Sequence, residues 1–464
     1  MLIGTFTTFI TQTILTTAFP TLMNSFHISA SLVQWLTTGF MLVMGIMIPV
    51  SAWLLSKFNV KHLYITAMSI FFIGTVLSRF AWSFPALLAG RLIQAVGVGM
   101  SAPTFQNVMY AIFPPERRGS AMGLAGIVIG LAPAIGPTLS GWVLLNHSWR
   151  ALFTILMPIV LVVIILASVS MHKVLETSNP KIDFLSVVES TIGFGSLLYG
   201  FSTVGTLGWG SPVVLSFLAV GFIVVALFAH RQLHMAQPLL ELRVFANKTF
   251  TLSTILTAVA FMSMVGVEMV LPMYIQTIRG QSAFNSGLLL LPGAIMMGIM
   301  SPITGRIFDR IGAKRLATCG LFLLLCGTFP LITLTAETPL LFVTVLYTVR
   351  MFGITMVTMP VTTAGMNALP TNLIAHGTAV NNTIRQIAAS IGTAILVSVL
   401  ATVTTNHTPL ASLKQADPVA FARQMQAATV AGYRAAFVVS LCLCVAGFLL
   451  SLRLRRDPID GGER

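Results

Sequence analysis

The chain consists mainly of apolar segments, roughly fourteen of them and each about twenty residues long, separated by short polar stretches. Hydrophobic residues make up 56% of the sequence and charged residues only 8%. Twenty residues at about 1.5 Å per residue span a hydrocarbon core of roughly 30 Å, and a helix satisfies its own backbone hydrogen bonds there. The sequence therefore predicts an all-α membrane protein with about fourteen transmembrane helices.

The charged residues gather in alternate loops. A formal net charge of +14 would suggest nucleic-acid binding in a soluble protein. Here the basic residues cluster in every second loop, which the positive-inside rule assigns to the cytoplasmic side. The clustered residues are Lys57, Lys61, Arg117, Arg118, Lys173, Lys181, Arg231, Arg243, Lys248, Arg306, Arg310, Lys314, Arg315, Arg453, Arg455 and Arg456. We therefore expect both termini in the cytoplasm, a location in a bacterial plasma membrane and no nucleic-acid partner.

Two stretches far apart in the chain, 52–63 and 305–316, repeat each other in outline. Arg91 in the fourth apolar segment is likewise echoed by Arg350 in the twelfth. The separation is too long for six adjacent spans, and an inserted two-helix hairpin accounts for the surplus. The predicted parts are a six-helix bundle over 1–170, the hairpin with its flanking loops over 171–248, and a second six-helix bundle with a short tail over 249–464. Parallel repeats of this kind suit a transporter whose substrate site lies between the halves.

Three longer motifs occur in the order in which one known family carries them. In chain order they are Arg91-x-x-Gln94-x-x-Gly97-x-Gly99 in the fourth segment, Gly130 to Gly141 with Pro133, Gly136 and Pro137 in the fifth, and Gly305-x-x-x-Asp309-Arg310-x-Gly312-x-Lys314 in a polar loop of the second half. Shorter matches are Trp149-Arg150, Pro238 to Phe245, Gln12-Thr13, Leu291-Pro292-Gly293, Met359-Pro360-Val361 and His376-Gly377-Thr378. Together they resemble the fourteen-span drug/proton antiporters of the major facilitator superfamily, most of all the lincomycin-resistance type of Gram-positive bacteria.

This resemblance implies the major facilitator fold and export of drugs in exchange for protons, with no cofactor. The chain departs from the family pattern at two places. Thr11 stands where many relatives carry an acid in the first span, and Ser56 and Asn59 replace an Asp and a Gly in the first-half loop. A proton carrier therefore cannot be assumed at Thr11, and the intact loop copy at 305–314 is expected to contribute more to gating.

Charged residues inside spans are candidates for function, because each costs about 2.5–3.5 kcal/mol to place in lipid on insertion scales. Glu268, in the ninth span, has no basic neighbour one helical turn away and is the candidate proton or cation site; the alternative is a structural, hydrogen-bonded acid. Arg91, with Gln94 one turn on, is expected to face a central cavity, or else to form an ion pair between helices. Gln12 and Thr11 complete this predicted cavity.

Two further charged residues leave alternatives open. Arg385 lies in a polar stripe near the cytoplasmic end of the thirteenth span and either lines a gate or cavity or extends its head group to the interface. Glu189 falls in the inserted hairpin, where a local structural role is favoured over a role in transport.

The other two motifs predict moving parts. Gly130, Pro133, Gly136, Pro137 and Gly141 would give a bent, closely packed helix that acts as a hinge, although ordinary helix packing uses the same residues.

The five fixed residues of the loop motif, Gly305, Asp309, Arg310, Gly312 and Lys314, would form a cytoplasmic gate. In it the Asp309 carboxylate either caps a neighbouring helix or pairs with a basic residue.

The leading hypothesis is a monomeric, proton-coupled antiporter that exports amphipathic, cationic or weakly basic drugs. The sequence has no Walker-type phosphate loop, so an ion gradient remains as the energy source. The alternatives are export of a lipid, peptide or metabolite, and a non-transporting membrane sensor. No nucleophile and base, metal cluster or phosphate loop indicates an enzyme. The four cysteines, which lie in apolar segments, are expected to be small buried side chains without a disulfide or metal.

Overall fold

The computed structural model describes residues 1–28, 30–172, 174 and 183–454, and the basic residues Lys173, Lys181, Arg455 and Arg456 lie outside this part. Thirteen of its helices are long and apolar enough to cross a membrane. One of them, α12 (Ala283–Thr328), contains two helices joined at Gly312, where the backbone is not helical. Counting α12 twice gives fourteen crossings, as predicted from the sequence.

The crossings form two six-helix bundles and one two-helix hairpin. The first bundle contains α1 (Leu2–Thr13) with α2 (Phe19–Phe26), α4 (Trp35–Lys57), α5 (Val60–Arg79), α6 (Phe84–Ile112), α7 (Arg118–Leu144) and α8 (Arg150–Ser170). The hairpin consists of α9 (Phe184–Leu207) and α10 (Pro212–His234). The second bundle contains α11 (Lys248–Thr277), α12, α13 (Leu340–Asn367), α14 (Ile374–Asn406) and α16 (Pro418–Ser451).

Short helices connect these elements. They are α3 (Ala30–Val33), α15 (Ala411–Ala416), η1 (Thr16–Ala18), η2 (Pro115–Arg117), η3 (Leu242–Ala246), η4 (Phe329–Thr333) and η5 (Thr371–Leu373). The part of the chain that is described contains no β-strand.

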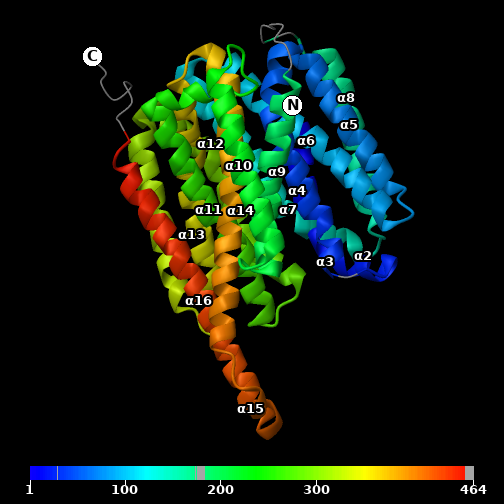
Figure 1. The fold of residues 1–464 in the computed structure, drawn as a ribbon, viewed down its shortest axis with the longest axis vertical. Helices are drawn as coiled ribbons and strands as arrows, with labels where there is room; N and C mark the ends of the chain where they lie inside the picture. Colours follow the sequence, from blue (N-terminus) through cyan, green and yellow to red (C-terminus); the bar gives the residue numbers. More distant parts are fainter. Residues whose placement is uncertain (29, 173, 175–182, 455–464) are drawn as a thin grey trace.

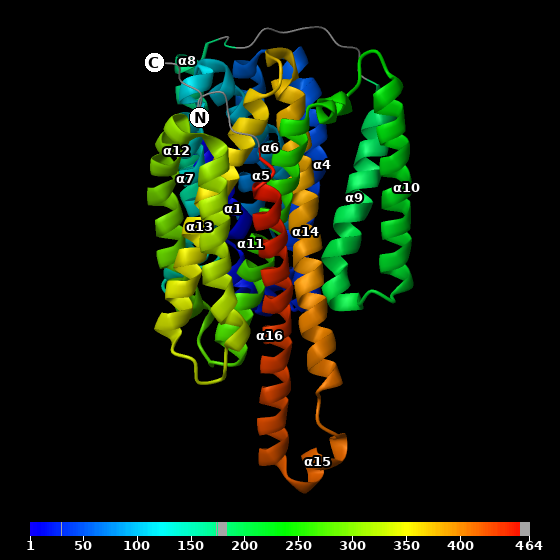
Figure 2. The same ribbon diagram turned by 90° about the vertical axis from the view of Figure 1, so that its left-hand side faces the viewer.

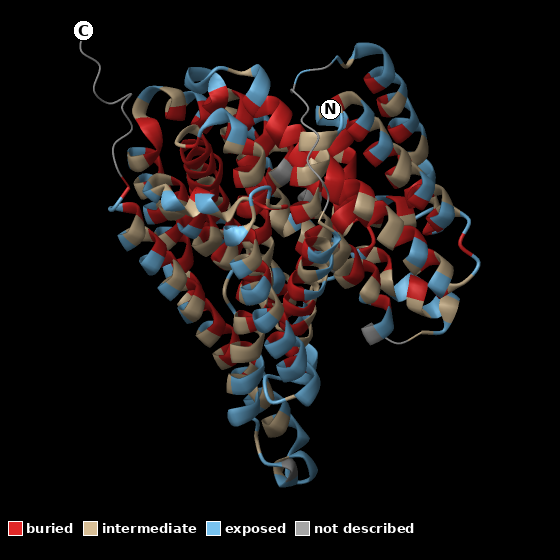
Figure 3. Cartoon of the chain, turned by 45° about the horizontal axis from the view of Figure 1, so that its top comes forward, coloured by how far each residue is buried: buried red, intermediate tan, exposed pale blue. Residues whose placement is uncertain are grey.

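Both ends of the helical array lie on the same side of the molecule, as an even number of crossings requires (Figure 1). The loops after α4 and α6 and the turn at Gly312 reach this side too, with Lys57, Arg117 and Arg310. We call this side the basic end. Buried residues concentrate inside the bundles, and the exposed residues cover their outer faces (Figure 3).

The hairpin stands beside the bundles and contacts both of them (Figure 2). Tyr199 of α9 stacks on Trp35 of α4, with ring centroids 5.6 Å apart. On the other side, Gly205 of α9 packs against Val397 of α14. The inserted segment therefore lies along the seam between the first bundle and the second.

A polar network fixes the hairpin at the basic end. The Asp183 carboxylate accepts hydrogen bonds from the Ser186 amide at the start of α9 and from Nε and Nη2 of Arg231, at 2.9 and 3.1 Å. Gln232 donates to the Ser186 hydroxyl and accepts from the Leu240 amide. The Arg231 guanidinium lowers the pKa of Asp183 to about 2, so this carboxylate is ionised at neutral pH.

The end opposite the basic end differs from the sequence-based expectation. The last two apolar segments of the sequence cover about 381–403 and 432–454, so a loop is expected over about 404–431 between them. In the structure α14 runs to Asn406 and α16 begins at Pro418. Both helices extend beyond the rest of the molecule and are joined through α15 (Figure 2). Asp417 is the N-cap of α16, because its carboxylate accepts hydrogen bonds from the amides of Val419 and Ala420. Pro418 stands at the first helical position, where it is favoured. These two local signals start the helix before the apolar segment begins.

We predict that Asp183→Ala lowers the thermal stability of the purified protein at pH 7 more than Asp183→Asn does. Asn keeps an oxygen that can cap α9, whereas Ala loses both the cap, worth about 1 kcal/mol, and the ion pair. The ion-pair contribution is complete above about pH 4 and is lost as the pH falls toward 2. Thermal unfolding of the solubilised protein measures the stabilities of the two variants, with the exposed Glu337→Gln as control. An unchanged unfolding midpoint for Asp183→Ala would contradict the prediction.

Candidate functional site

The two bundles are joined at the basic end by a carboxylate that caps a helix. Asp309 of α12 accepts hydrogen bonds from the backbone amides of Gly119 and Ser120, both at 2.9 Å, and from the Ser120 hydroxyl. These amides belong to the first turn of α7, whose unpaired N–H groups and dipole favour a negative charge. Of the two arrangements considered for Asp309, the structure contains the helix cap.

The glycines of the same motif allow this approach. A Cβ atom on Gly305 would overlap the carbonyl oxygen of Gly119, so only glycine permits the contact between α12 and α7. Gly312, at φ 76°, occupies the left-handed region and makes the turn between the two helices of α12. The structure places Arg310 on the surface and Lys314 at a half-buried position.

More polar contacts close the basic end beside this cap. Nδ2 of Asn382 in α14 donates to Oε1 of Gln106 in α6, at 2.7 Å. The Arg118 guanidinium donates to Oδ1 of Asn367 at the end of α13, at 2.9 Å. Each contact joins the first bundle to the second, so the structure represents a state that is closed at the basic end.

Arg385 lies between the bundles. Its guanidinium carbon is 4.7 Å from the ring centroid of Phe261 in α11, and it interacts electrostatically with Tyr110 of α6. Within the described part of the chain, this guanidinium makes no hydrogen bond or ion pair, and its nitrogens are not among the buried polar atoms. Arg385 thus presents an accessible positive charge between the bundles instead of extending it outward to the interface.

Glu268 lies on the same face of α11 as Phe261, because seven residues make about two helical turns. Thr257, four residues before Phe261 on the same stripe of the helix, contacts Thr362 of α13, with hydroxyl oxygens 3.4 Å apart. Gly266 packs against α14 on the opposite side of α11. Because the guanidinium of Arg385, which also interacts with Tyr110 of the first bundle, lies over Phe261, this face is turned toward the first bundle and not toward lipid.

The Glu268 side chain is half-buried. Among the residues that the structure describes, it forms no hydrogen bond and no ion pair, and its oxygens are not among the buried polar atoms. We call Phe261, Glu268 and Arg385 the interior wall.

Arg350 supplies a charge behind this wall. Its side chain is 0% exposed and donates to the Ser263 carbonyl and hydroxyl oxygens, at 3.2 and 3.3 Å, and to the Thr328 hydroxyl. It interacts electrostatically with Glu268, as does Tyr347. Glu268 has no basic neighbour one turn away along α11, as the sequence indicates, but the sequence did not reveal this basic group, which comes from another helix and forms no ion pair with Glu268. The repeat that relates Arg350 to Arg91 is the signal in the sequence that marked this residue.

Arg91 and Gln94 do not line an open space, contrary to the prediction. Both side chains are 0% exposed. Arg91 donates to the Leu36 carbonyl at 3.3 Å and to Oε1 of Gln94 at 2.9 Å, and its guanidinium lies 4.2 Å from the centroid of the Phe40 ring. Gln94 donates to Thr75 of α5. The pair is enclosed by α4, α5 and α6, where it holds the helices of the first bundle together.

The first-span candidates are also packed inside the first bundle. The Thr11 hydroxyl is 0% exposed and donates to the Thr7 carbonyl, 2.8 Å away. Gln12 is buried and donates to the sulfur of Met44 in α4. Glu189, in α9, lies outside the two bundles and interacts electrostatically with Arg231.

The glycines of the predicted hinge lie in α7, where they contact other helices closely. Gly130 packs against Met297 and Gly141 against Phe284, both in α12, and Gly136 packs against Thr13 of the first span. Pro137 accepts a long hydrogen bond from Thr17, at 3.5 Å. The side chain of Pro133 lies outside what the structure describes. This arrangement brings α7 close to α12 along its length.

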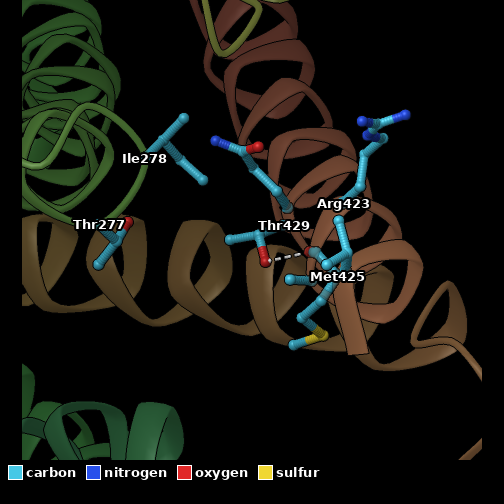
Figure 4. A pocket seen from close by; sticks show the side chains of 8 residues that line it. Thr277, Ile278, Arg423, Met425 and Thr429 are labelled. Atoms are coloured by element: carbon cyan, nitrogen blue, oxygen red, sulfur yellow. Dashed lines mark hydrogen bonds between the residues drawn. The ribbon is translucent and has the colours of Figure 1, made fainter. Parts of the chain in front are cut away.

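A groove of 540 Å³ opens at the end opposite the basic end, between the last turn of α11 and the extension of α16 (Figure 4). Thr277 and Ile278 line one side and Arg423, Met425 and Thr429 the other, and none of the predicted site residues lies there.

The described residues contain no group of three His, Cys, Asp or Glu side chains that could hold a metal. Cys319, Cys326 and Cys442 are exposed and only Cys444 is buried, so burial is wrongly predicted for three of the four cysteines. In a membrane helix an apolar surrounding is provided by lipid as well as by protein.

Comparison with known proteins identifies the family. Residues 1–393 match the sequence profile of the Major Facilitator Superfamily. The chain belongs to this superfamily. It is 49% identical to the MFS-type transporter YcnB of Bacillus subtilis over 456 residues, which cover 98% of this chain and 94% of that protein. It is 39% identical to the lincomycin resistance protein LmrB of the same organism over 463 residues, 99% of this chain and 95% of that one.

The fold of this superfamily member is also that of a solved structure. The human organic anion transporter MFSD10 superposes with a TM-score of 0.68 over 97% of both chains, at 13% sequence identity. The chain is thus a multi-pass membrane transporter with bacterial relatives that handles small molecules, and its relatives include drug-resistance proteins.

We predict that Asp309→Asn opens the basic end in part of the population. The substitution removes the charge from a helix cap worth about 1–2 kcal/mol in a partly buried setting, which shifts a two-state equilibrium by roughly 5- to 30-fold. Nitroxide labels are placed at the exposed positions Arg117 and Arg315, one in each bundle, and the distances between them are measured by electron paramagnetic resonance. The distance distribution should gain a longer component in Asp309→Asn. Glu116→Gln, an exposed acid at the same end, is the matched control. An unchanged distance distribution for Asp309→Asn would show that the cap does not hold the end closed.

Proposed function

We propose that this transporter is a proton-coupled antiporter that exports amphipathic, cationic or weakly basic drugs by alternating access, as a monomer. The relatives named for lincomycin and multidrug resistance support drugs as the substrates. The observation that carries the coupling is Glu268, an accessible carboxylate on the interior wall. A carboxylate in this position can hold either a proton or a cationic substrate, which is the exchange that antiport requires.

The gating elements suit the same mechanism. The Asp309 cap and the pair of Gln106 and Asn382 join the bundles at the basic end. We propose that this end faces the cytoplasm, that both termini lie there, and that these contacts break when the interior opens to receive the drug. The loop glycines and the close contacts of α7 with α12 would let the bundles rock against each other.

The proton gradient can supply the work. A proton that moves through ~100 mV gains ~2.3 kcal/mol, and one pH unit adds ~1.4 kcal/mol. At ~1.4 kcal/mol for each factor of ten, one proton for each drug supports a gradient of several hundredfold. One exchangeable acid, without a cofactor, is therefore sufficient for export, and no enzymatic step is needed.

The test uses purified protein in liposomes with an imposed pH gradient and ethidium as the transported dye. We expect the wild type to move the dye with the gradient, and Glu268→Gln to abolish this movement while the protein still folds, because an amide cannot exchange a proton. Glu268→Asp should retain part of the rate, and Glu337→Gln, an acid exposed at the opposite end, should retain all of it.

Two results would contradict the proposal. Gradient-driven transport that is unchanged in Glu268→Gln would remove this acid from the mechanism. If the wild type moves neither ethidium nor several unrelated drugs, a lipid, peptide or metabolite exporter, or a sensor, would be the better description.

A further inference from the structure

Two opposite charges on the interior wall lack a partner of their own. The ion pairs in the described part of the chain are Asp183 with Arg231 and Glu241 with Arg243, which lie in the hairpin and the linker after it. Arg385 and Glu268 belong to neither pair, and both present accessible polar atoms between the bundles. A charge in such a place is costly unless a ligand or water compensates it, so each charge is a candidate for ligand recognition.

The two charges are too far apart to neutralise each other. The guanidinium of Arg385 lies over Phe261, and Glu268 follows Phe261 by seven residues on the same helix face. Seven residues rise on the order of 10 Å along a helix, so the head groups are separated by about this distance. The ring of Phe261 and the half-buried Val265 lie between them, which makes the middle of the wall apolar.

The neighbouring polar groups do not neutralise the charges of Glu268 and Arg385. Arg350 interacts with Glu268 from α13, but it forms no ion pair with it, and its two Nη atoms already donate to Ser263 and Thr328 inside the second bundle. Tyr110, which faces Arg385 from α6, is a neutral phenol. Arg385 therefore remains free to form a bidentate contact with a carboxylate, which its planar guanidinium suits better than any other side chain.

We propose that the interior selects amphipathic zwitterions, with Arg385 binding the anionic group of the substrate and Glu268 the basic group. This inference rests on the proposed function, because it names the substrate class of the same interior. A zwitterion with its charges separated by several ångströms satisfies both wall charges, whereas a purely cationic drug leaves Arg385 uncompensated. Arg385 is then the residue that determines specificity.

A matched pair of dyes tests this inference. Rhodamine B is a zwitterion at neutral pH, and its ethyl ester is a cation of nearly the same shape. We expect the solubilised wild type to bind rhodamine B more tightly than the ester, as measured by fluorescence anisotropy. Arg385→Gln should reduce this preference about tenfold, which corresponds to about 1.4 kcal/mol, and Arg385→Lys should restore part of it by keeping the charge.

Two controls separate recognition from structural damage. Arg423→Gln removes an exposed arginine from the groove at the opposite end and should leave the preference as in the wild type. Glu268→Gln should lower the affinity for both dyes, because both carry a cationic ring system. An equal affinity of the wild type for the two dyes, or an equal loss for both in Arg385→Gln, would overturn the inference.

Failure of the proposed function has a different signature. The same dyes are followed in liposomes with and without a pH gradient. Binding that prefers rhodamine B without any gradient-driven movement would support the selectivity and reject proton-coupled export. Gradient-driven movement of both dyes without any preference in binding or rate would support proton-coupled export and reject the selectivity for zwitterions.

Discussion

Closure of the basic end depends on a carboxylate that one bundle presents to the backbone of the other. Asp309 satisfies two amides in the first turn of α7 that have no partner within their own helix. The contact requires the backbones at Gly119 and Gly305 to approach without side chains between them. Because water could satisfy the same polar groups once the bundles separate, this contact can hold one state without preventing the other.

The charges inside the protein divide into two groups according to the internal repeat. Arg91 and Arg350 repeat each other, and both are fully buried and hydrogen-bonded within their own bundles. Glu268 and Arg385 are accessible between the bundles. At the separation of the repeat, Glu268 falls near Thr11, which is a packed neutral side chain. The common scaffold is thus symmetric, whereas the residues proposed for substrate and proton are not.

The sequence predicted the fold well and the candidate site less well. The number of crossings follows from apolar length, since the backbone has no other way to satisfy its hydrogen bonds in lipid. The helical extension of α16 was missed, because apolar length says nothing about helix outside the membrane and the cap at Asp417 is a local signal. Arg91 was expected beside a cavity because an intramembrane charge indicates function, but Leu36, Gln94 and Phe40 surround this charge.

The sequence by itself determined the helical class, the number of crossings, the repeat with its inserted hairpin, and the family. These depend on local composition and on motifs that can be read along the chain. Only the tertiary structure decided which charges are accessible, that α9 lies along the seam between α4 and α14, and that Asp309 caps α7. The reason is physical: the accessibility of a charge and the groups around it depend on side chains of other helices, such as Arg350 near Glu268 and Phe261 beneath Arg385, which lie far away along the chain.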